Sequence, residues 1–189
     1  MPKKIVIQPK ELFDEKENRF INVKETTLIL EHSLISISKW ESKWKKPFLV
    51  EGSLGTVEEV LDYIKCMTVT PVNVPDEVYL GITKENIEEI VAYIQDPMTA
   101  TWFGEDKNPN HKRRKKEVLT SEVIYWQMIA LEIPQAYEKW HLNRLLTLIR
   151  VCSAKNEEMS GDNKMSKDAI RRQNAALNAQ RRAKMHSKG

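Results

Sequence analysis

The sequence has few glycines, few cysteines and no long hydrophobic run. Six glycines in 189 residues leave little material for phosphate-binding loops, and no GxGxxG, GxxxxGK[ST] or GxSxG pattern is present. Cys66 and Cys152 lie far apart and neither belongs to a CxxC pair, so we expect reduced thiols in a cytosolic protein without a signal peptide. No apolar run approaches the roughly 20 residues of a membrane helix, and we expect a soluble protein without a membrane partner.

Side chains for catalysis or metal binding are also sparse. No histidine has another histidine, a cysteine or an acid at a recognised ligand spacing; the four are His32, His111, His141 and His186. The sequence therefore predicts no metal, no cofactor and no catalytic residue, and hence no enzyme. His141, beside Trp140 and before Arg144, fits a buried, hydrogen-bonded histidine better than a ligand-binding one, although a binding role stays open.

The net charge of +3 hides a strong segregation of charge. Residues 107–116 carry six basic residues and no acid, and residues 164–189 carry eight basic residues and one acid. The remainder of the chain therefore has a net charge of −10. Two basic segments on an acidic body indicate electrostatic contacts with nucleic acid or with the acidic body of another copy.

The first 31 residues are typical of a small antiparallel sheet. β-branched and aromatic residues favour strands at 3–7, 19–23 and 26–30, with a polar turn-forming stretch that includes residues 14–18. From about His32 the apolar period changes to three or four residues, which predicts a helix that ends before Pro47. A strand at residues 34–37 remains the alternative.

Capping residues predict the later helices. Thr56 with Glu59 forms a capping-box pattern, Thr83 caps a helix that closes before Pro97, and Thr120 begins another. The segment after Pro134 is expected as one helix, paired with the Thr120 helix through inward-facing residues that include Trp126 and Ile129.

We therefore expect an α+β fold, mainly α, with four parts. A sheet at residues 1–31 precedes a helical body at 32–154, which contains a basic loop at 104–119. Polar residues 155–165 are expected to form a linker, and residues 166–189 a basic helical extension. Residues 71–81 are expected to be an irregular connector.

Aromatic and basic residues are the candidates for partner binding. Tryptophans supply the large rigid surfaces that dominate interface hot spots, although burial in the core is the first expectation for them. The basic residues would supply electrostatic contacts, but their segment at 166–186 lacks aromatics for stacking on bases, so nucleic acid is not a favoured partner. The candidates are Trp40, Trp44, Trp140, Arg113, Arg114, Arg171, Arg172, Arg181 and Arg182.

Three strings together resemble a family of long-tailed bacteriophage proteins, the tail assembly chaperones. They are residues 34–44 with Pro47-Phe48-Leu49, residues 140–150 (WHLNRLLTLIR) with Val151-Cys152, and residues 172–182. The resemblance covers a general pattern over most of the chain and includes no short catalytic signature. It implies a small, helix-rich, non-enzymatic protein of the host cell cytoplasm.

The resemblance further implies that the chain binds the long helical tape-measure protein and keeps it soluble while tail-tube subunits assemble along it. An aromatic and aliphatic groove could cover the apolar stripe of such a helix. The charge segregation adds an expectation of self-association between copies. Two alternatives remain: a structural component of the virion at the tail or head–tail junction, and, less favoured, a nonspecific nucleic-acid-binding protein.

Overall fold

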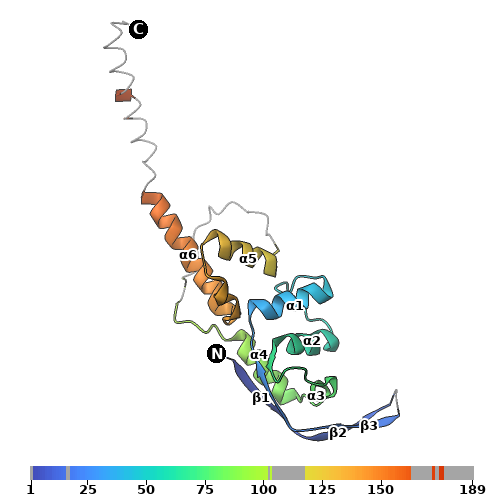
Figure 1. Ribbon diagram of the computed structural model, residues 1–189. Coiled ribbons are helices and arrows are strands. Elements are labelled where there is room, and N and C mark those ends of the chain that lie inside the picture. The colour runs from blue at the N-terminus through green and yellow to red at the C-terminus, as the bar shows by residue number, and fades with distance from the viewer. Residues whose placement is uncertain are drawn as a thin grey trace, which may run out of the picture. The chain divides into compact units, whose positions relative to one another are not determined.

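A computed structural model describes residues 2–15, 18–101, 103, 118–162, 172, 175 and 176. Residues 1–149 form one compact unit, called unit 1, and residues 150–189 form a second. The expected α+β class, mainly α, is confirmed, since a small N-terminal antiparallel sheet accompanies a set of helices (Figure 1). Within the described ranges, no helix is both long and apolar enough to cross a membrane.

Among the described residues, five strands form two antiparallel sheets. The first sheet has the order β1-β4-β5, and the second pairs β2 with β3. The strands are β1 (Lys3–Ile7), β2 (Lys10–Asp14), β3 (Arg19–Val23), β4 (Thr26–Leu30) and β5 (Thr68–Thr70). The expected strands at 3–7, 19–23 and 26–30 are confirmed, whereas β2 and β5 were not predicted. β2 is a charged strand and β5 has only three residues, so neither shows a clear apolar period.

The helices begin largely where capping residues predict. Ser33, Thr56, Thr83 and Thr120 each accept a hydrogen bond from the backbone N–H three residues later. The helices are α1 (Leu34–Trp44), α2 (Val57–Met67), α3 (Asp76–Leu80), α4 (Lys84–Gln95), α5 (Ser121–Ala130), the 3₁₀ helix η1 (Gln135–Lys139) and α6 (Leu142–Asp162). Residues 34–37 are therefore helical, and the strand alternative is wrong.

The core of unit 1 lies between the first sheet and the helices. α1 contacts α2 on one side and α5 on another, and α4 contacts β1 (Figure 1). Alternate residues of the strands point into this core, as the two-residue period of a strand requires. Fully or nearly fully buried residues include Ile5, Ile7, Leu28, Leu30, Leu34, Ile37, Trp40, Tyr63, Ile64, Met67, Ile124, Leu142 and Leu145.

Three expectations need correction. The connector at 71–81 contains the short helix α3, and the single helix expected after Pro134 is divided into η1 and α6. The division occurs because Trp140 is extended and His141 forms a β-bridge with Ser33, after which the Leu142 N–H donates to the His32 carbonyl at 2.9 Å. Residues 155–162, expected within a linker, continue α6 because no proline interrupts them.

Candidate functional site

Trp40 lies in the core and not on a binding surface. None of its surface is exposed, and its Nε1 donates to the backbone carbonyl of Glu59 at 3.1 Å. Its ring also packs edge-on against Phe48. The prediction that Trp40 contacts a client is therefore wrong, because the period that placed it on one face of α1 placed it on the buried face.

Trp44 and Trp140 are half-buried, and each is held by neighbouring side chains. Trp44 donates from Nε1 to Asp62 Oδ2 at 2.9 Å. The Trp140 ring stacks on Tyr137 with centroids 4.1 Å apart, and the Arg144 guanidinium lies 4.1 Å from the Trp140 centroid. Both tryptophans keep partial exposure, so they stay candidates for the edge of a binding surface.

The basic candidates are mostly outside the described residues. Arg172 is helical and exposed. The positions that the structure does not describe are Arg113, Arg114, Arg171, Arg181 and Arg182, together with most of the expected basic loop at 104–119. The electrostatic role of these arginines therefore stays a prediction.

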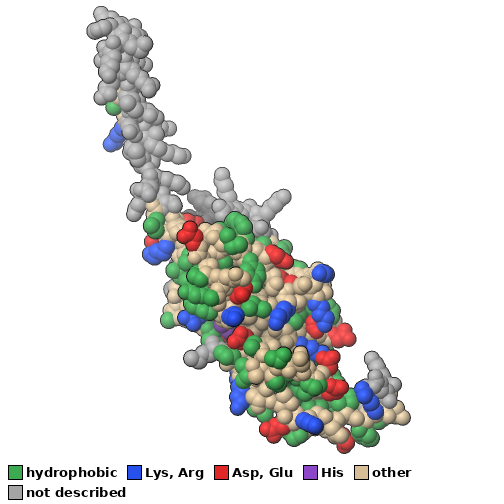
Figure 2. Space-filling view, in the orientation of Figure 1, with side chains coloured by type: hydrophobic (Ala, Val, Ile, Leu, Met, Phe, Trp, Pro, Cys, Tyr) green, Lys and Arg blue, Asp and Glu red, His purple; other side chains and the backbone are tan. Residues whose placement is uncertain are grey.

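On α5, two large apolar side chains that were expected to face inward are exposed. This helix is apolar on all sides and carries a single charged residue, Glu122. Ile124 and Met128 point into the core, whereas Trp126 is 66% exposed and Ile129 is 76% exposed. Figure 2 shows hydrophobic side chains gathered where α5 lies, and no described residue covers this pair. We call Trp126 and Ile129, with the exposed Ala130 beside them, the α5 face.

The α5 face could not be identified from the hydrophobic period, for a physical reason. A helix that is apolar all round has no preferred period, so residues directed inward and outward look alike. The prediction that Trp126 and Ile129 point inward is wrong. The available signal was the composition itself: nearly uncharged helices are buried on all sides or bind something.

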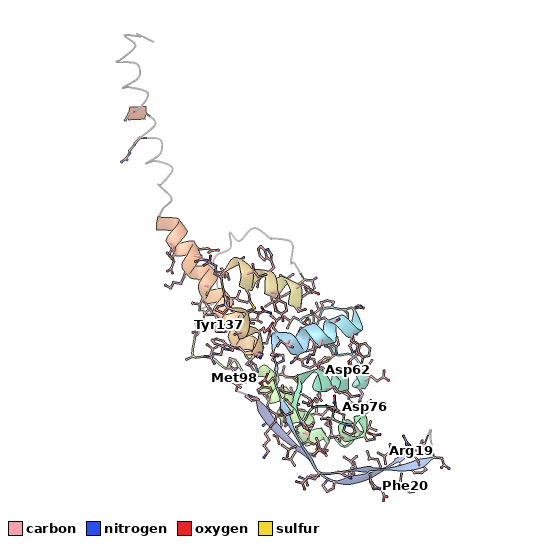
Figure 3. All side chains as sticks on the ribbon, viewed as in Figure 1. Arg19, Phe20, Asp62, Asp76, Met98 and Tyr137 are labelled. Carbon is pink, nitrogen blue, oxygen red and sulfur yellow. The ribbon has the colours of Figure 1, made fainter. Side chains whose placement is uncertain are left out.

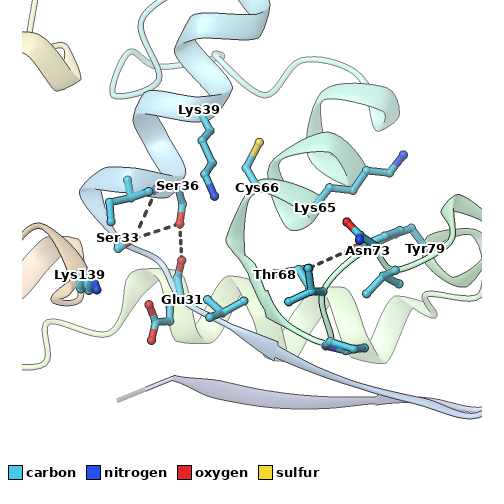
Figure 4. A pocket seen from close by; sticks show the side chains of 15 residues that line it. Glu31, Ser33, Ser36, Lys39, Lys65, Cys66, Thr68, Asn73, Tyr79 and Lys139 are labelled. Carbon is cyan, nitrogen blue, oxygen red and sulfur yellow. Dashed lines mark hydrogen bonds between the residues drawn. The ribbon is translucent and has the colours of Figure 1, made fainter.

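A second candidate is a cleft of about 620 Å³ bounded by α1, α2, β5 and α3 (Figure 4). Exposed Val69 and Val72 give it an apolar wall, and Lys39, Lys65 and Lys139 lie around it. Burial raises the pKa of the Cys66 thiol, which keeps it protonated and poorly nucleophilic. Within the described residues, no group of three His, Cys, Asp or Glu side chains is arranged to hold a metal. The lining suits an apolar peptide with acidic side chains better than a reaction.

Two buried histidines form a polar junction beside a cavity of about 320 Å³. The His32 and His141 ring centroids are 5.0 Å apart. His141 Nε2 lies 2.9 Å from the Tyr93 carbonyl, and because a carbonyl only accepts, Nε2 must donate the proton. Neutral His141 then has a bare Nδ1, which is buried and has no partner in the described part of the chain. His141 thus takes the buried role that the sequence favoured.

Burial keeps both histidines neutral. It lowers the pKa of His32 to about 3, with a smaller contribution from the charge that His141 would carry. Burial also lowers the pKa of His141, against the opposing effect of its hydrogen bond to Tyr93. The junction joins the start of α1 to α2, α4 and α6, since His32 Nδ1 shares a hydrogen bond with the Tyr63 hydroxyl.

Comparison with known proteins gives no assignment for the α5 face, the cleft or the histidine junction. No family model matches the sequence, and neither the curated proteins nor the solved structures gave a match.

Proposed function

We propose that this protein is a tail assembly chaperone of a long-tailed bacteriophage that acts in the host cytoplasm by binding the tape-measure protein without covalent chemistry. The proposal starts from the resemblance of residues 34–49, 140–152 and 172–182 to that family. Tail-tube subunits and further copies of the chain are the other partners that it implies.

The observation that carries the proposal is the α5 face. Trp126 and Ile129 are three residues apart, so they lie on the same side of the helix and form one continuous apolar ridge. A tape-measure helix has an apolar stripe of its own, and packing that stripe on the ridge would remove both from water. Tryptophan at the centre of such a contact is typical of an interface hot spot.

The test is co-expression with the tape-measure protein of the same phage. We expect the chain to keep the tape-measure protein in the soluble fraction and to co-purify with it. The double variant Trp126→Ser and Ile129→Ser should reduce the co-purified amount at least about tenfold, because removing two large apolar contacts costs more than about 1.4 kcal/mol.

The control removes exposed apolar side chains elsewhere on unit 1. Val57 on α2 is 76% exposed and Leu80 on α3 is 51% exposed, so Val57→Ser with Leu80→Ser removes two exposed apolar side chains that lie outside both the α5 face and the cleft. This control should retain the client. Equal losses in both double variants would contradict a role for the α5 face. Stoichiometric recovery of the chain in purified particles would instead favour the structural virion component.

A further inference from the structure

The β2–β3 ribbon is a two-stranded sheet that extends beyond the helices (Figure 1). Leu12 is in register with Ile21, and Phe13 is in register with Phe20. Because successive side chains of a strand point to opposite faces, the ribbon carries one apolar pair on each face. Phe13 and Phe20 are exposed, with ring centroids 5.0 Å apart, and Figure 3 shows Arg19 and Phe20 toward the ribbon's outer end.

Such a ribbon needs support. A two-stranded hairpin alone is marginally stable in water, and a third strand or a helix is normally required. Here Val23, at the base of the ribbon, packs close to Gly81 at the end of α3. The outer part has no third strand among the described residues, since β2 pairs with β3 alone. The free edge of β2 therefore offers backbone groups to another strand.

The sequence of β2 indicates which strand fits this edge. β2 reads Lys10-Glu11-Leu12-Phe13-Asp14. When two copies of β2 run antiparallel about Leu12, Lys10 of each copy lies opposite Asp14 of the other, and the two Leu12 residues lie opposite each other. Both charged pairs are attractive in sign, and in this register they flank the leucine pair along the strand.

The same charges argue against a simple protective role. A strand edge that is protected against pairing carries like charges, most often lysines, which repel the same edge of a second copy. Lys10 and Asp14 are instead opposite in sign and equally distant from Leu12. An inverted copy of the strand is therefore attracted in one register, and a shift of two residues would remove both charged pairs.

We propose that β2 pairs with β2 of a second copy, related by a two-fold axis at Leu12, to form a four-stranded antiparallel sheet. The contact is isologous, so it closes as a dimer and does not propagate. It covers only five residues on each strand, so the association is weak and salt-sensitive by comparison with a standard interface. The partner surface is distinct from the α5 face, and the proposal does not depend on a client.

The test uses charge reversal in the full chain, with the dimerisation constant measured by sedimentation equilibrium. In a dimer of the Lys10→Glu variant, the new acid of each copy lies opposite Asp14 of the other copy, so both cross-strand pairs repel. In a dimer of the Asp14→Lys variant, the new lysine of each copy lies opposite Lys10 of the other, with the same result. Each variant alone should dimerise at least about tenfold more weakly than the natural chain. An equimolar mixture should recover association, because the acid introduced at position 10 then faces the lysine introduced at position 14, and the natural Asp14 faces the natural Lys10.

The mixture also controls for folding. Asp14 is in register with Arg19 of its own ribbon, so Asp14→Lys alone could disturb the hairpin. A variant with a disturbed hairpin would not restore dimerisation when it is mixed with the Lys10→Glu variant. Lys24→Glu makes the same charge change outside the strand and should leave the dimerisation constant unchanged. A natural chain that stays monomeric at millimolar concentration, or a mixture that stays as weak as its components, would overturn the proposal.

A cross-link checks the register. Residues directly opposite across antiparallel strands have Cβ atoms about 4.5–5.5 Å apart, near the distance that a disulfide needs. In a background with Cys66→Ser and Cys152→Ser, Leu12→Cys should form a disulfide-linked dimer under mild oxidation. Phe13→Cys should form much less, because residue 13 faces residue 11 of the other copy. Equal cross-linking at the two positions would exclude this register.

Discussion

Glu41 is a buried carboxylate that joins three segments of unit 1. Its Oε1 accepts from the Phe48 backbone N–H at 2.8 Å, and its Oε2 accepts from the backbone N–H and the hydroxyl of Ser121. The carboxylate therefore ties α1 to the chain after Pro47 and to the start of α5. Hydrogen bonds to a charged group are stronger than neutral ones, and a buried donor left without its acceptor pays its full desolvation cost.

Glu41→Gln should therefore destabilise the protein. An amide has one accepting oxygen in place of two and turns a donor toward N–H groups, so we expect a loss of about 1.5–3 kcal/mol in the free energy of unfolding. Urea unfolding followed by circular dichroism measures it. Glu58→Gln, on the exposed surface of α2, should change the same quantity by less than about 0.5 kcal/mol. A similar loss in both variants would refute the role of the buried network.

The histidine junction predicts a pH dependence of stability. In the unfolded chain both histidines have a pKa of about 6.5, whereas burial lowers the folded pKa of His32 to about 3 and lowers that of His141 as well. Below about pH 6.5 the unfolded chain binds protons that the folded chain excludes. The free energy of unfolding should therefore fall with falling pH, by up to about 1.4 kcal/mol for each pH unit and each histidine.

The informative range is about pH 7 to 5, because carboxylates titrate below it. Chemical unfolding across this range gives the number of protons taken up on unfolding. The variant His32→Gln should reduce that number by close to one at about pH 5, even though its overall stability changes. An unchanged proton uptake would show that His32 is protonated in the folded protein.

At the scale of elements, local chemistry explains what the sequence could predict. Thr56 and Thr83 mark helix starts because their side chains satisfy backbone N–H groups within the same segment. The break at Trp140 depends on Ser33, which lies far earlier in the chain, so local pattern could not reveal it. The outward direction of Trp126 likewise depends on which side of α5 meets the core.

The contact between α3 and the sheets is another non-local feature. A Cβ on Gly81 would lie 2.8 Å from Val23 Cγ1 and 3.0 Å from Ile7 Cγ2, closer than carbon atoms pack. Gly81→Ala should therefore push α3 away from β1 and β3. We expect it to lower the free energy of unfolding by about 1–3 kcal/mol, as overpacking does. Gly55→Ala is the control, since its nearest contact would be an ordinary 3.6 Å. Thermal unfolding compares the two variants. An unchanged unfolding temperature for Gly81→Ala would show that α3 can shift without a loss of stability.

At the scale of the whole molecule, apolar and charged features fall in different parts of the chain. The α5 face belongs to unit 1, whereas residues 164–189 hold eight basic residues against one acid. Apolar contacts in a desolvated interface act mainly on the dissociation rate, and peripheral charges act mainly on the association rate and its salt dependence. Binding of the proposed client should separate into these two contributions.

Two sets of substitutions test this separation by surface plasmon resonance with the tape-measure protein. Neutralising the arginines should slow association several-fold at low salt and flatten its salt dependence, with the dissociation rate nearly unchanged; the four changes are Arg171→Gln, Arg172→Gln, Arg181→Gln and Arg182→Gln. Trp126→Ser with Ile129→Ser should instead speed dissociation and leave the salt dependence as it was. If the arginine variant dissociates faster and associates at the natural rate, those arginines lie inside the interface. The division of labour between the α5 face and the basic segment would then be wrong.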